Sequence, residues 1–183
     1  MSGGSILLVR HGQTEWNLAG RYQGWGDSPL TALGIAQAQA VGRHLRDLPE
    51  ARSAAIVTSP IGRARRSADL IRTELGYDLP LTCDERLREI SIGAWDGLTR
   101  AEIGALVPGI FDGDGRGEWY FRCPDGETYE QFAGRIASWL EEAAGTIEEI
   151  AVATVAAPET PGSATPARSA PQPAPARGGR AQP

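Results

Sequence analysis

Arg10 and His11 follow directly on a short apolar run, residues 5–9, that is typical of a buried strand. A histidine at the carboxyl end of a parallel strand lies where α/β folds place their ligand sites. The neighbouring guanidinium and the neutral groups of Thr14 and Asn17 suit a phosphate, and an imidazole can attack phosphorus. Alone, such a histidine is more often part of an ordinary loop, so the prediction of phosphoryl transfer depends on further residues.

Arg63 is a second candidate for holding a phosphate. It follows another apolar run, residues 54–58, and lies in the first turn of a predicted helix that has Pro60 at its first position. A cation is unfavourable for a helix at this end, whereas the unbonded N–H groups there attract anions. We therefore interpret Arg63 as a phosphate ligand. The neighbouring Arg65 and Arg66 are interpreted as a solvated helix face.

Glu89 follows a third apolar run, residues 79–83. A carboxylic acid beside a phosphate can protonate a leaving oxygen and then deprotonate a water molecule. The charge of a nearby phosphate would raise the pKa of Glu89, as that role requires. The sequence leaves a second interpretation equally open, in which Glu89 is a salt-bridge partner of Arg86 or Arg88.

The elements that must position these residues alternate between strands and helices. Short apolar runs predict four strands, at residues 5–9, 54–58, 79–83 and 147–155. Apolar stripes at helical spacing predict three long helices, at residues 31–48, 59–75 and 127–144. Turn residues delimit a fourth, short helix at residues 97–106. We therefore predict an α/β fold, a three-layer α/β/α arrangement with a mainly parallel sheet.

Two local features refine this fold prediction. Thr31 is the expected N-cap of the helix at 31–48, and Gly76 the expected residue after the C-terminus of the helix at 59–75. Residues 110–126 are rich in glycine and are expected to form a long irregular excursion over the surface. The side chains at 119–122 (Trp, Tyr, Phe, Arg) are expected either to line a pocket or to cover the core.

Composition argues against several classes of partner. The chain has 183 residues, 41% of them hydrophobic, and a formal net charge of −5, which disfavours nucleic acid or an anionic membrane as the main partner. The longest aliphatic run, residues 6–9, is far too short to cross a bilayer, and no secretory signal is visible. The two cysteines, Cys83 and Cys123, indicate a reducing compartment. We expect a cytoplasmic protein, whose oligomeric state the sequence leaves open.

Taken together, these segments resemble the histidine phosphatase superfamily, in its phosphoglycerate-mutase-like branch. The string at residues 10–17 matches the family signature most completely. Further matching segments follow in the family's order, at residues 21–34, 59–64, 87–97 and 124–127. The resemblance covers about residues 5–150, and it implies a histidine phosphatase-like fold.

The resemblance also implies roles for individual residues. His11 would be the nucleophile that forms a phosphohistidine, and Glu89 the proton donor. The phosphate or substrate would be bound by Arg10, Arg63 and Asn17, with help from Thr14, Gln23 and Gly24. No metal or cofactor is implied, because arginines and an imidazole neutralise the phosphoryl group, and the sequence offers no metal-ligand spacing. The expected partner is a small phosphorylated substrate.

One feature of the family is missing from the sequence. The family uses a second active-site histidine at the end of a later strand, but the residues that follow 150–155 include none. The other histidine of the chain, His44, lies in the predicted helix at 31–48 and is interpreted as a surface residue. We therefore expect a fold that is incomplete at its C-terminal end and an impaired activity.

The composition changes at residue 158. Residues 158–183 hold 7 of the 13 prolines and have no Val, Ile, Leu, Met or aromatic residue. They predict a disordered Ala/Pro/Arg-rich tail after a domain at 1–157. A genuine tail and an out-of-frame read both fit this composition. Because all 18 basic residues are arginine, as in a GC-rich gene, we favour the frameshift, which an unchanged frame on resequencing would contradict.

Three functions are compatible with these residues. The preferred one is a phosphomonoester hydrolase that acts through a phosphohistidine on a small phosphorylated metabolite. The first alternative is a phosphoglycerate mutase-type phosphoryl transfer, but that branch carries a longer insertion than residues 111–124 provide. The second is a non-catalytic domain that binds a phospholigand or a protein partner, which the missing histidine motivates.

Overall fold

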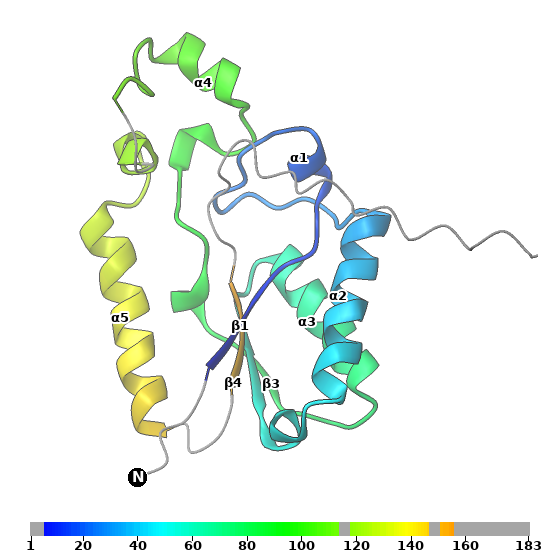
Figure 1. Cartoon of the computed structure of the whole chain (residues 1–183). Helices are drawn as coiled ribbons and strands as arrows, with labels where there is room; N and C mark the ends of the chain where they lie inside the picture. Colours follow the sequence, from blue (N-terminus) through cyan, green and yellow to red (C-terminus); the bar gives the residue numbers. More distant parts are fainter. Residues whose placement is uncertain (1–5, 114–117, 147–150, 156–183) are drawn as a thin grey trace, which may run out of the picture.

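A four-stranded sheet forms the centre of the molecule in the computed structural model, which describes residues 6–113, 118–146 and 151–155 (Figure 1). The strand order is β1-β4-β2-β3. The strand bounds are β1 Ile6–Arg10, β2 Ala55–Thr58, β3 Leu81–Cys83 and β4 Ala151–Val155. Every pairing among these described strands is parallel, which confirms the predicted type of sheet.

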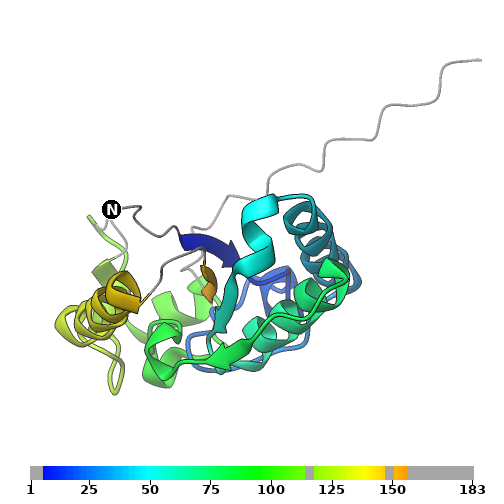
Figure 2. The same ribbon diagram turned by 90° about the horizontal axis from the view of Figure 1, so that it is seen from below.

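Helices cover the sheet on both faces. On one face lie α2 (Ala32–Arg46) and α3 (Gly62–Leu75), which pack in a cluster with Ile56. On the other face lies α5 (Tyr129–Thr146), whose apolar residues pack with Val57. Successive residues of a strand point to opposite faces of the sheet. The neighbouring residues Ile56 and Val57 of β2 therefore pack against helices on different faces. Figures 1 and 2 show the sheet between the helices, and the predicted three-layer α/β/α fold is confirmed.

The ends of two helices follow the signals in the sequence. The hydroxyl of Thr31 accepts a hydrogen bond from the backbone N–H of Gly34 at 3.0 Å, so it caps α2 as predicted. After α3, Gly76 has a φ of 76°, a left-handed conformation that glycine adopts without strain.

The start of α3 differs from the prediction. Pro60 was expected at the first helical position, but the helix begins at Gly62. The backbone N–H of Arg63 is bound by Oδ1 of Asp27 at 3.0 Å. One N–H group at this helix end is therefore bound by a carboxylate that is distant in sequence, and no local pattern in the sequence indicates this contact.

A close backbone approach places α2 against the loop that follows β1. A Cβ atom added to Gly12 would collide with the carbonyl oxygen of Gly34, and one added to Gly34 would collide with that of Gln13. Only residues without a side chain allow this contact. The first turn of α2 thereby supports the segment that carries His11.

A second hydrophobic cluster lies beyond the sheet. It includes residues of α4 (Arg100–Leu106) and of the 3-10 helices Gly93–Trp95 and Glu118–Arg122, in part buried aromatic side chains. The remaining short elements are α1 (Glu15–Leu18) and the 3-10 helices Pro49–Ser53 and Glu85–Leu87; Ala51 packs in the cluster with α2 and α3, and Leu87 in the cluster with α5. Ile110 and Trp119 are buried in the cluster beyond the sheet, so the described part of 110–126 is irregular but not merely superficial. Both cysteines are free thiols, Cys83 exposed and Cys123 buried.

The last described strand, β4, lies between β1 and β2, where Val155 is in register with Arg10 and Thr154 with Thr58. The position just past this strand, at which the family would carry its second histidine, lies outside the described residues, as do the predicted tail at 158–183 and part of the predicted strand at 147–155. Within the described ranges, no helix has both the length and the apolar character that crossing a membrane requires.

Candidate active site

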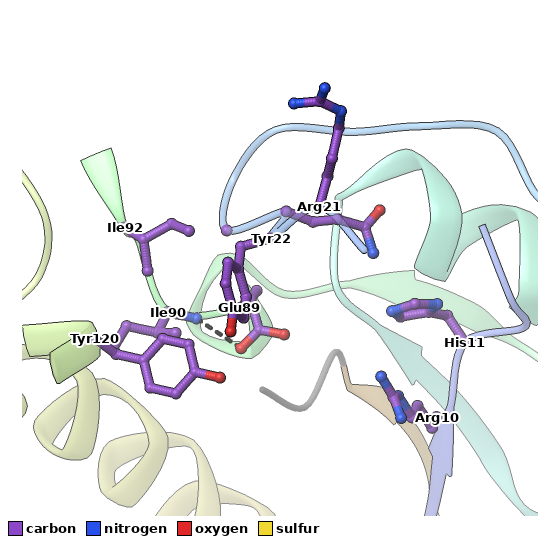
Figure 3. Close-up of a pocket in the computed structure, with 10 residues that line it drawn as sticks. Arg10, His11, Arg21, Tyr22, Glu89, Ile90, Ile92 and Tyr120 are labelled. Carbon is purple, nitrogen blue, oxygen red and sulfur yellow. Dashed lines mark hydrogen bonds between the residues drawn. The ribbon is translucent and has the colours of Figure 1, made fainter. Parts of the chain in front are cut away.

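One cavity, open to solvent, lies at the carboxyl end of β1 (Figure 3), and its empty space including the open mouth is about 350 Å³. It is lined by Arg10, His11, Arg21, Tyr22, Gln23, Gly24, Glu89, Ile90, Ile92 and Tyr120. Five of the eight residues predicted from the sequence are therefore brought together here: His11, Glu89, Arg10, Gln23 and Gly24. Figure 3 shows Arg10 and His11 on one side of the cavity and Glu89 across from them.

The imidazole of His11 is buried and held in one orientation. Its Nδ1 lies 2.7 Å from the carbonyl oxygen of Gly12. A carbonyl can only accept, so Nδ1 carries the proton and Nε2 keeps its lone pair. Burial lowers the pKa of His11 to about 4, and the charges of Arg63 and Arg10 act in the same direction. The ring is therefore neutral at neutral pH, as a nucleophile must be.

Ser67, on α3, is hydrogen-bonded to the residue that follows His11. The backbone N–H of Gly12 donates to its hydroxyl at 3.1 Å, and that hydroxyl donates to the carbonyl oxygen of Arg63 at 2.8 Å. Sequence reasoning missed this residue. The spacing of four residues from Arg63 would place both on one face of a helix, which is the only signal the sequence contains.

Glu89 is the second buried titratable group of the cavity. Its side-chain Oε1 accepts the backbone N–H of Ile90 at 3.0 Å. Burial raises the pKa of Glu89 to about 7, against the opposing effect of that hydrogen bond and of nearby arginines. A carboxyl group with this pKa is protonated in a large fraction of molecules near neutral pH and can act as a general acid.

The alternative interpretation of Glu89 as a salt-bridge partner is wrong. Arg86 pairs with Asp84 at 2.6 Å and with Glu142 at 2.7 Å. Arg88 pairs with Glu85 at 2.6 Å. The two neighbouring arginines thus have other carboxylate partners, and Glu89 faces the cavity.

Arg135 and Glu127 fix the segment that carries Glu89. The guanidinium of Arg135 binds both carboxylate oxygens of Glu127, at 2.7 and 2.8 Å. It also donates to the carbonyl oxygens of Arg86, Arg88 and Glu89, at 2.6, 2.7 and 2.8 Å. We call these two residues the Arg135–Glu127 clamp.

Glu127 binds the same segment directly. Its Oε2 accepts the backbone N–H of Ser91 at 2.9 Å, and its own N–H donates to the carbonyl oxygen of Ser91 at 2.9 Å. Both members of the clamp are largely buried, with side chains 15% and 13% exposed. Sequence reasoning missed Arg135, although it placed Glu127 in a loop that matches the family.

Arg63 is not among the residues that line the cavity. Its side chain is fully buried, and its guanidinium donates to the carbonyl oxygens of Gly26 at 2.6 Å and Gly24 at 2.9 Å. It therefore holds the loop that presents Gly24 to the cavity. Its charge still acts on both His11 and Glu89.

Thr14 and Asn17 also lie outside the cavity lining. They form a reciprocal cap on α1: the N–H of Thr14 donates to Oδ1 of Asn17 at 2.9 Å, and the N–H of Asn17 donates to Oγ1 of Thr14 at 3.1 Å. The Thr14 hydroxyl donates to Oε1 of Gln23 at 3.0 Å. Because this bond occupies the amide oxygen, Gln23 keeps its NH₂ group as a donor. The structure thus places Thr14 and Asn17 where they shape the site, and their predicted contact with the phosphate stays a prediction.

The described residues contain no cluster of three or more histidine, cysteine, aspartate or glutamate side chains that could hold a metal ion. Among the described residues of the lining, the guanidinium of Arg10 and the amide of Gln23 can bind an anion next to the buried imidazole of His11. His44, on the exposed surface of α2, is not among the lining residues, in agreement with its predicted surface position.

The parallel three-layer fold, with a buried histidine at the end of β1 facing a buried acid, defines a protein of the histidine phosphatase class. The family model described as histidine phosphatase superfamily (branch 1) matches residues 6–158. The chain belongs to this superfamily, and its resemblance to the phosphoglycerate-mutase-like branch is confirmed by its relatives.

Three relatives illustrate the range of this family. The probable phosphoglycerate mutase GpmB of Salmonella arizonae is 40% identical over 143 residues, which are 74% of this chain and 60% of that protein. YhfR of Bacillus stearothermophilus has 36% identity and a TM-score of 0.72 over 83% of this chain and 73% of its own. A mycobacterial glucosyl-3-phosphoglycerate phosphatase has 29% identity and a TM-score of 0.65, over 82% of this chain and 75% of the phosphatase. The chain thus spans about three fifths of the length of the curated relatives it matches.

Proposed function

We propose that this protein hydrolyses phosphate monoesters of small metabolites through a phosphohistidine at His11. The observation that carries the proposal is the pairing, in one cavity, of a neutral imidazole with Nε2 unprotonated and a carboxyl group whose pKa is about 7. The two groups have the protonation states that nucleophilic attack and leaving-group protonation need.

The first half of the reaction transfers the phosphoryl group to the protein. Nε2 of His11 attacks phosphorus, the bond between phosphorus and the ester oxygen breaks, and that oxygen takes the proton of Glu89. Arg10 and the amide of Gln23 stabilise the phosphoryl oxygens, because both groups lie in the cavity beside His11. The hydrogen bond from Nδ1 to Gly12 stabilises the positive charge that develops on the ring.

The second half releases phosphate. Glu89, now a carboxylate, takes a proton from a water molecule that attacks the phosphohistidine, and the bond between phosphorus and nitrogen breaks. Inorganic phosphate leaves, and both residues return to their starting protonation states. One carboxyl group thus serves as acid and then as base, for which a pKa near neutrality is favourable.

The pH dependence of hydrolysis follows from these two residues. We expect kcat/KM to rise through about pH 4, above which His11 is neutral, and to fall through about pH 7, above which Glu89 has lost its proton. The substrate phosphate also ionises at about pH 6, so the control is the profile of the Glu89→Gln variant. The limb that this variant loses belongs to Glu89. A wild-type profile in which the rate does not decline above neutral pH would contradict the assignment.

The missing second histidine limits the proposed activity. The chain has two histidines, and His44 lies on the exposed face of α2. By analogy with a lost oxyanion-hole donor, the absence of one phosphate ligand lowers turnover by a factor of about 100–1,000. We therefore propose a slow phosphatase.

Labelling of His11 tests the proposal. Incubation of the full chain with a ³²P-labelled phosphate ester is expected to give an acid-labile, base-stable phosphoprotein. His11→Ala should remove the label, and the matched control His44→Ala should leave it unchanged, because His44 is exposed and does not line the cavity. Phosphate binding without any labelled His11 would favour the alternative of a non-catalytic phospholigand-binding domain.

A phosphoglycerate mutase-type activity is the second candidate, because the curated relatives carry that name. Hydrolysis and isomerisation are separated by assaying 3-phosphoglycerate and para-nitrophenyl phosphate side by side. Release of inorganic phosphate supports the phosphatase. Conversion of 3-phosphoglycerate to its 2-phospho isomer without phosphate release would support the mutase instead.

A further inference from the structure

Asp96 lies beside the segment of chain that leads into the cavity lining. It directly follows the 3-10 helix Gly93–Trp95. The next residue, Gly97, donates its backbone N–H to the carbonyl oxygen of Tyr22 at 2.8 Å. This bond places Asp96 next to residues 23–26, the first two of which line the cavity. We call residues 23–26 the cavity loop.

Both oxygens of the Asp96 carboxylate contact the cavity loop. Oδ2 accepts the backbone N–H of Gly26 at 2.8 Å. Oδ1 lies against Gly24, where an added Cβ atom would collide with it. Gly24 has a φ of 49°, a left-handed conformation that favours glycine. Asp96 is not among the described residues that line the cavity, so it touches the loop and not the space that a ligand would fill.

Arg63 binds the same loop through its other polar groups. Its guanidinium donates to the carbonyl oxygens of Gly24 and Gly26, at 2.9 and 2.6 Å, whereas Asp96 accepts an N–H group. Burial lowers the pKa of Arg63, and the charges of nearby carboxylates, Asp96 among them, oppose this effect. Removing the Asp96 carboxylate would therefore weaken the loop's contacts with the anion and leave the buried cation less compensated.

The cavity loop presents the amide of Gln23 to the cavity. Oε1 of this amide accepts the hydroxyl of Thr14 at 3.0 Å, which leaves the NH₂ group to donate to a phosphoryl oxygen. Further along the loop, Nε1 of Trp25 donates to the carbonyl oxygen of Glu89 at 2.8 Å. The three residues after Gln23 are thus each held by a neighbouring segment. Because a hydrogen bond weakens steeply when its geometry is poor, the place of the loop decides how well the amide can bind phosphate.

We propose, on the basis of the proposed function, that Asp96 is a positioning residue that holds the cavity loop so that the Gln23 amide meets the phosphoryl oxygens. Asp96 exchanges no proton with the substrate in this role. Loss of its carboxylate should weaken the binding of phosphate, and the size of that loss should depend on Gln23.

Calorimetric titration of full-length variants with inorganic phosphate tests the first expectation. Asp96→Ala removes the acceptor of the Gly26 N–H and should raise the Kd for phosphate about tenfold to 100-fold, the range for a hydrogen bond to a charged group. Asp96→Asn keeps an acceptor oxygen and should bind at least about threefold more tightly than Asp96→Ala. Unchanged binding by Asp96→Ala, or equal losses in both variants, would overturn the proposal.

Glu74→Ala is the matched control for the loss of a carboxylate. Glu74 lies on α3, pairs with Arg43 at 3.3 Å, and is not among the described residues that line the cavity. Its removal should leave the Kd for phosphate unchanged. An effect as large as that of Asp96→Ala would show that the loss is not specific to the cavity loop and would overturn the proposal.

A double-mutant cycle with Gln23→Ala separates positioning from a general loss of structure. If Asp96 acts through the Gln23 amide, Asp96→Ala should raise the Kd by less than about threefold once Gln23 is already alanine. A general loss of structure would give equal losses in both backgrounds, and that result would overturn the proposal. Urea denaturation shows whether each variant is folded, and Asp96→Ser takes the place of Asp96→Ala in the cycle if the alanine variant is unfolded.

Phosphate binding also separates this inference from the proposed hydrolysis. If no ester is hydrolysed and His11 is not labelled, the proposed function fails, and the dependence of phosphate binding on Asp96 and Gln23 still decides the positioning role. If Asp96→Ala hydrolyses para-nitrophenyl phosphate with an unchanged kcat/KM, the proposed function stands and the inference fails. A wild-type chain that does not bind phosphate would overturn the inference.

Discussion

Replacing Glu89 by glutamine is expected to lower kcat for the hydrolysis of benzyl phosphate by a factor of about 100–10,000. Glutamine keeps the volume of the side chain and can still accept the hydrogen bond from the backbone N–H of Ile90. It cannot transfer a proton to the alkoxide that leaves when His11 attacks phosphorus. Steady-state rates with benzyl phosphate measure the effect.

The leaving group provides an internal control for this variant. The oxygen of para-nitrophenol is a much weaker base than that of benzyl alcohol and leaves without general-acid help. The Glu89→Gln variant should therefore give a burst of para-nitrophenol, followed by slow turnover in which the phosphohistidine accumulates, because water attack still lacks its base. Loss of the burst together with the turnover would contradict a proton-transfer role. Benzyl phosphate turnover that stays unchanged would contradict any catalytic role of Glu89.

The positions of His11 and Glu89 could be predicted from the sequence because each follows a strand-like apolar run within a contiguous motif. Parallel strands bring their carboxyl ends to one edge of the sheet, so residues that follow them lie near one another. The three layers were predictable for a similar reason, because the apolar periodicities of strands and helices are local. These parts of the fold and site depend on short stretches of chain.

Other parts depend on contacts between distant segments and could not be predicted. Arg135 reaches the carbonyl oxygen of Glu89 across 46 positions, and Asp27 binds the N-terminus of α3 across 36. For Arg63, the sequence indicated a phosphate ligand, whereas the structure shows a buried guanidinium bound to carbonyl oxygens of another loop. The insertion of β4 between β1 and β2 is likewise a long-range pairing.

The Arg135–Glu127 clamp leads to the largest expected change in stability. Replacing Arg135 by alanine leaves a largely buried carboxylate without its cation and three carbonyl oxygens without their donor. Removing one partner of a buried ion pair costs about 3–5 kcal/mol. We expect the free energy of unfolding, measured by urea denaturation, to fall by about that amount. Arg43→Ala is the control, because Arg43 itself is exposed and its surface pair with Glu74 is worth about 1 kcal/mol or less.

The pH dependence of unfolding distinguishes the lost pair from a general loss of packing. Burial alone would raise the pKa of Glu127, but hydrogen bonds from Arg135 and Ser91 outweigh it and lower the pKa. A carboxyl group with a lowered pKa stabilises the fold above its unfolded-state pKa of about 4.3, and that contribution is lost as the pH falls. Arg135→Ala should therefore lose this acid-side dependence. Adding Glu127→Gln to Arg135→Ala should restore part of the stability, because no buried charge is then left unpaired, whereas two fully additive losses would show that the residues do not act as a pair.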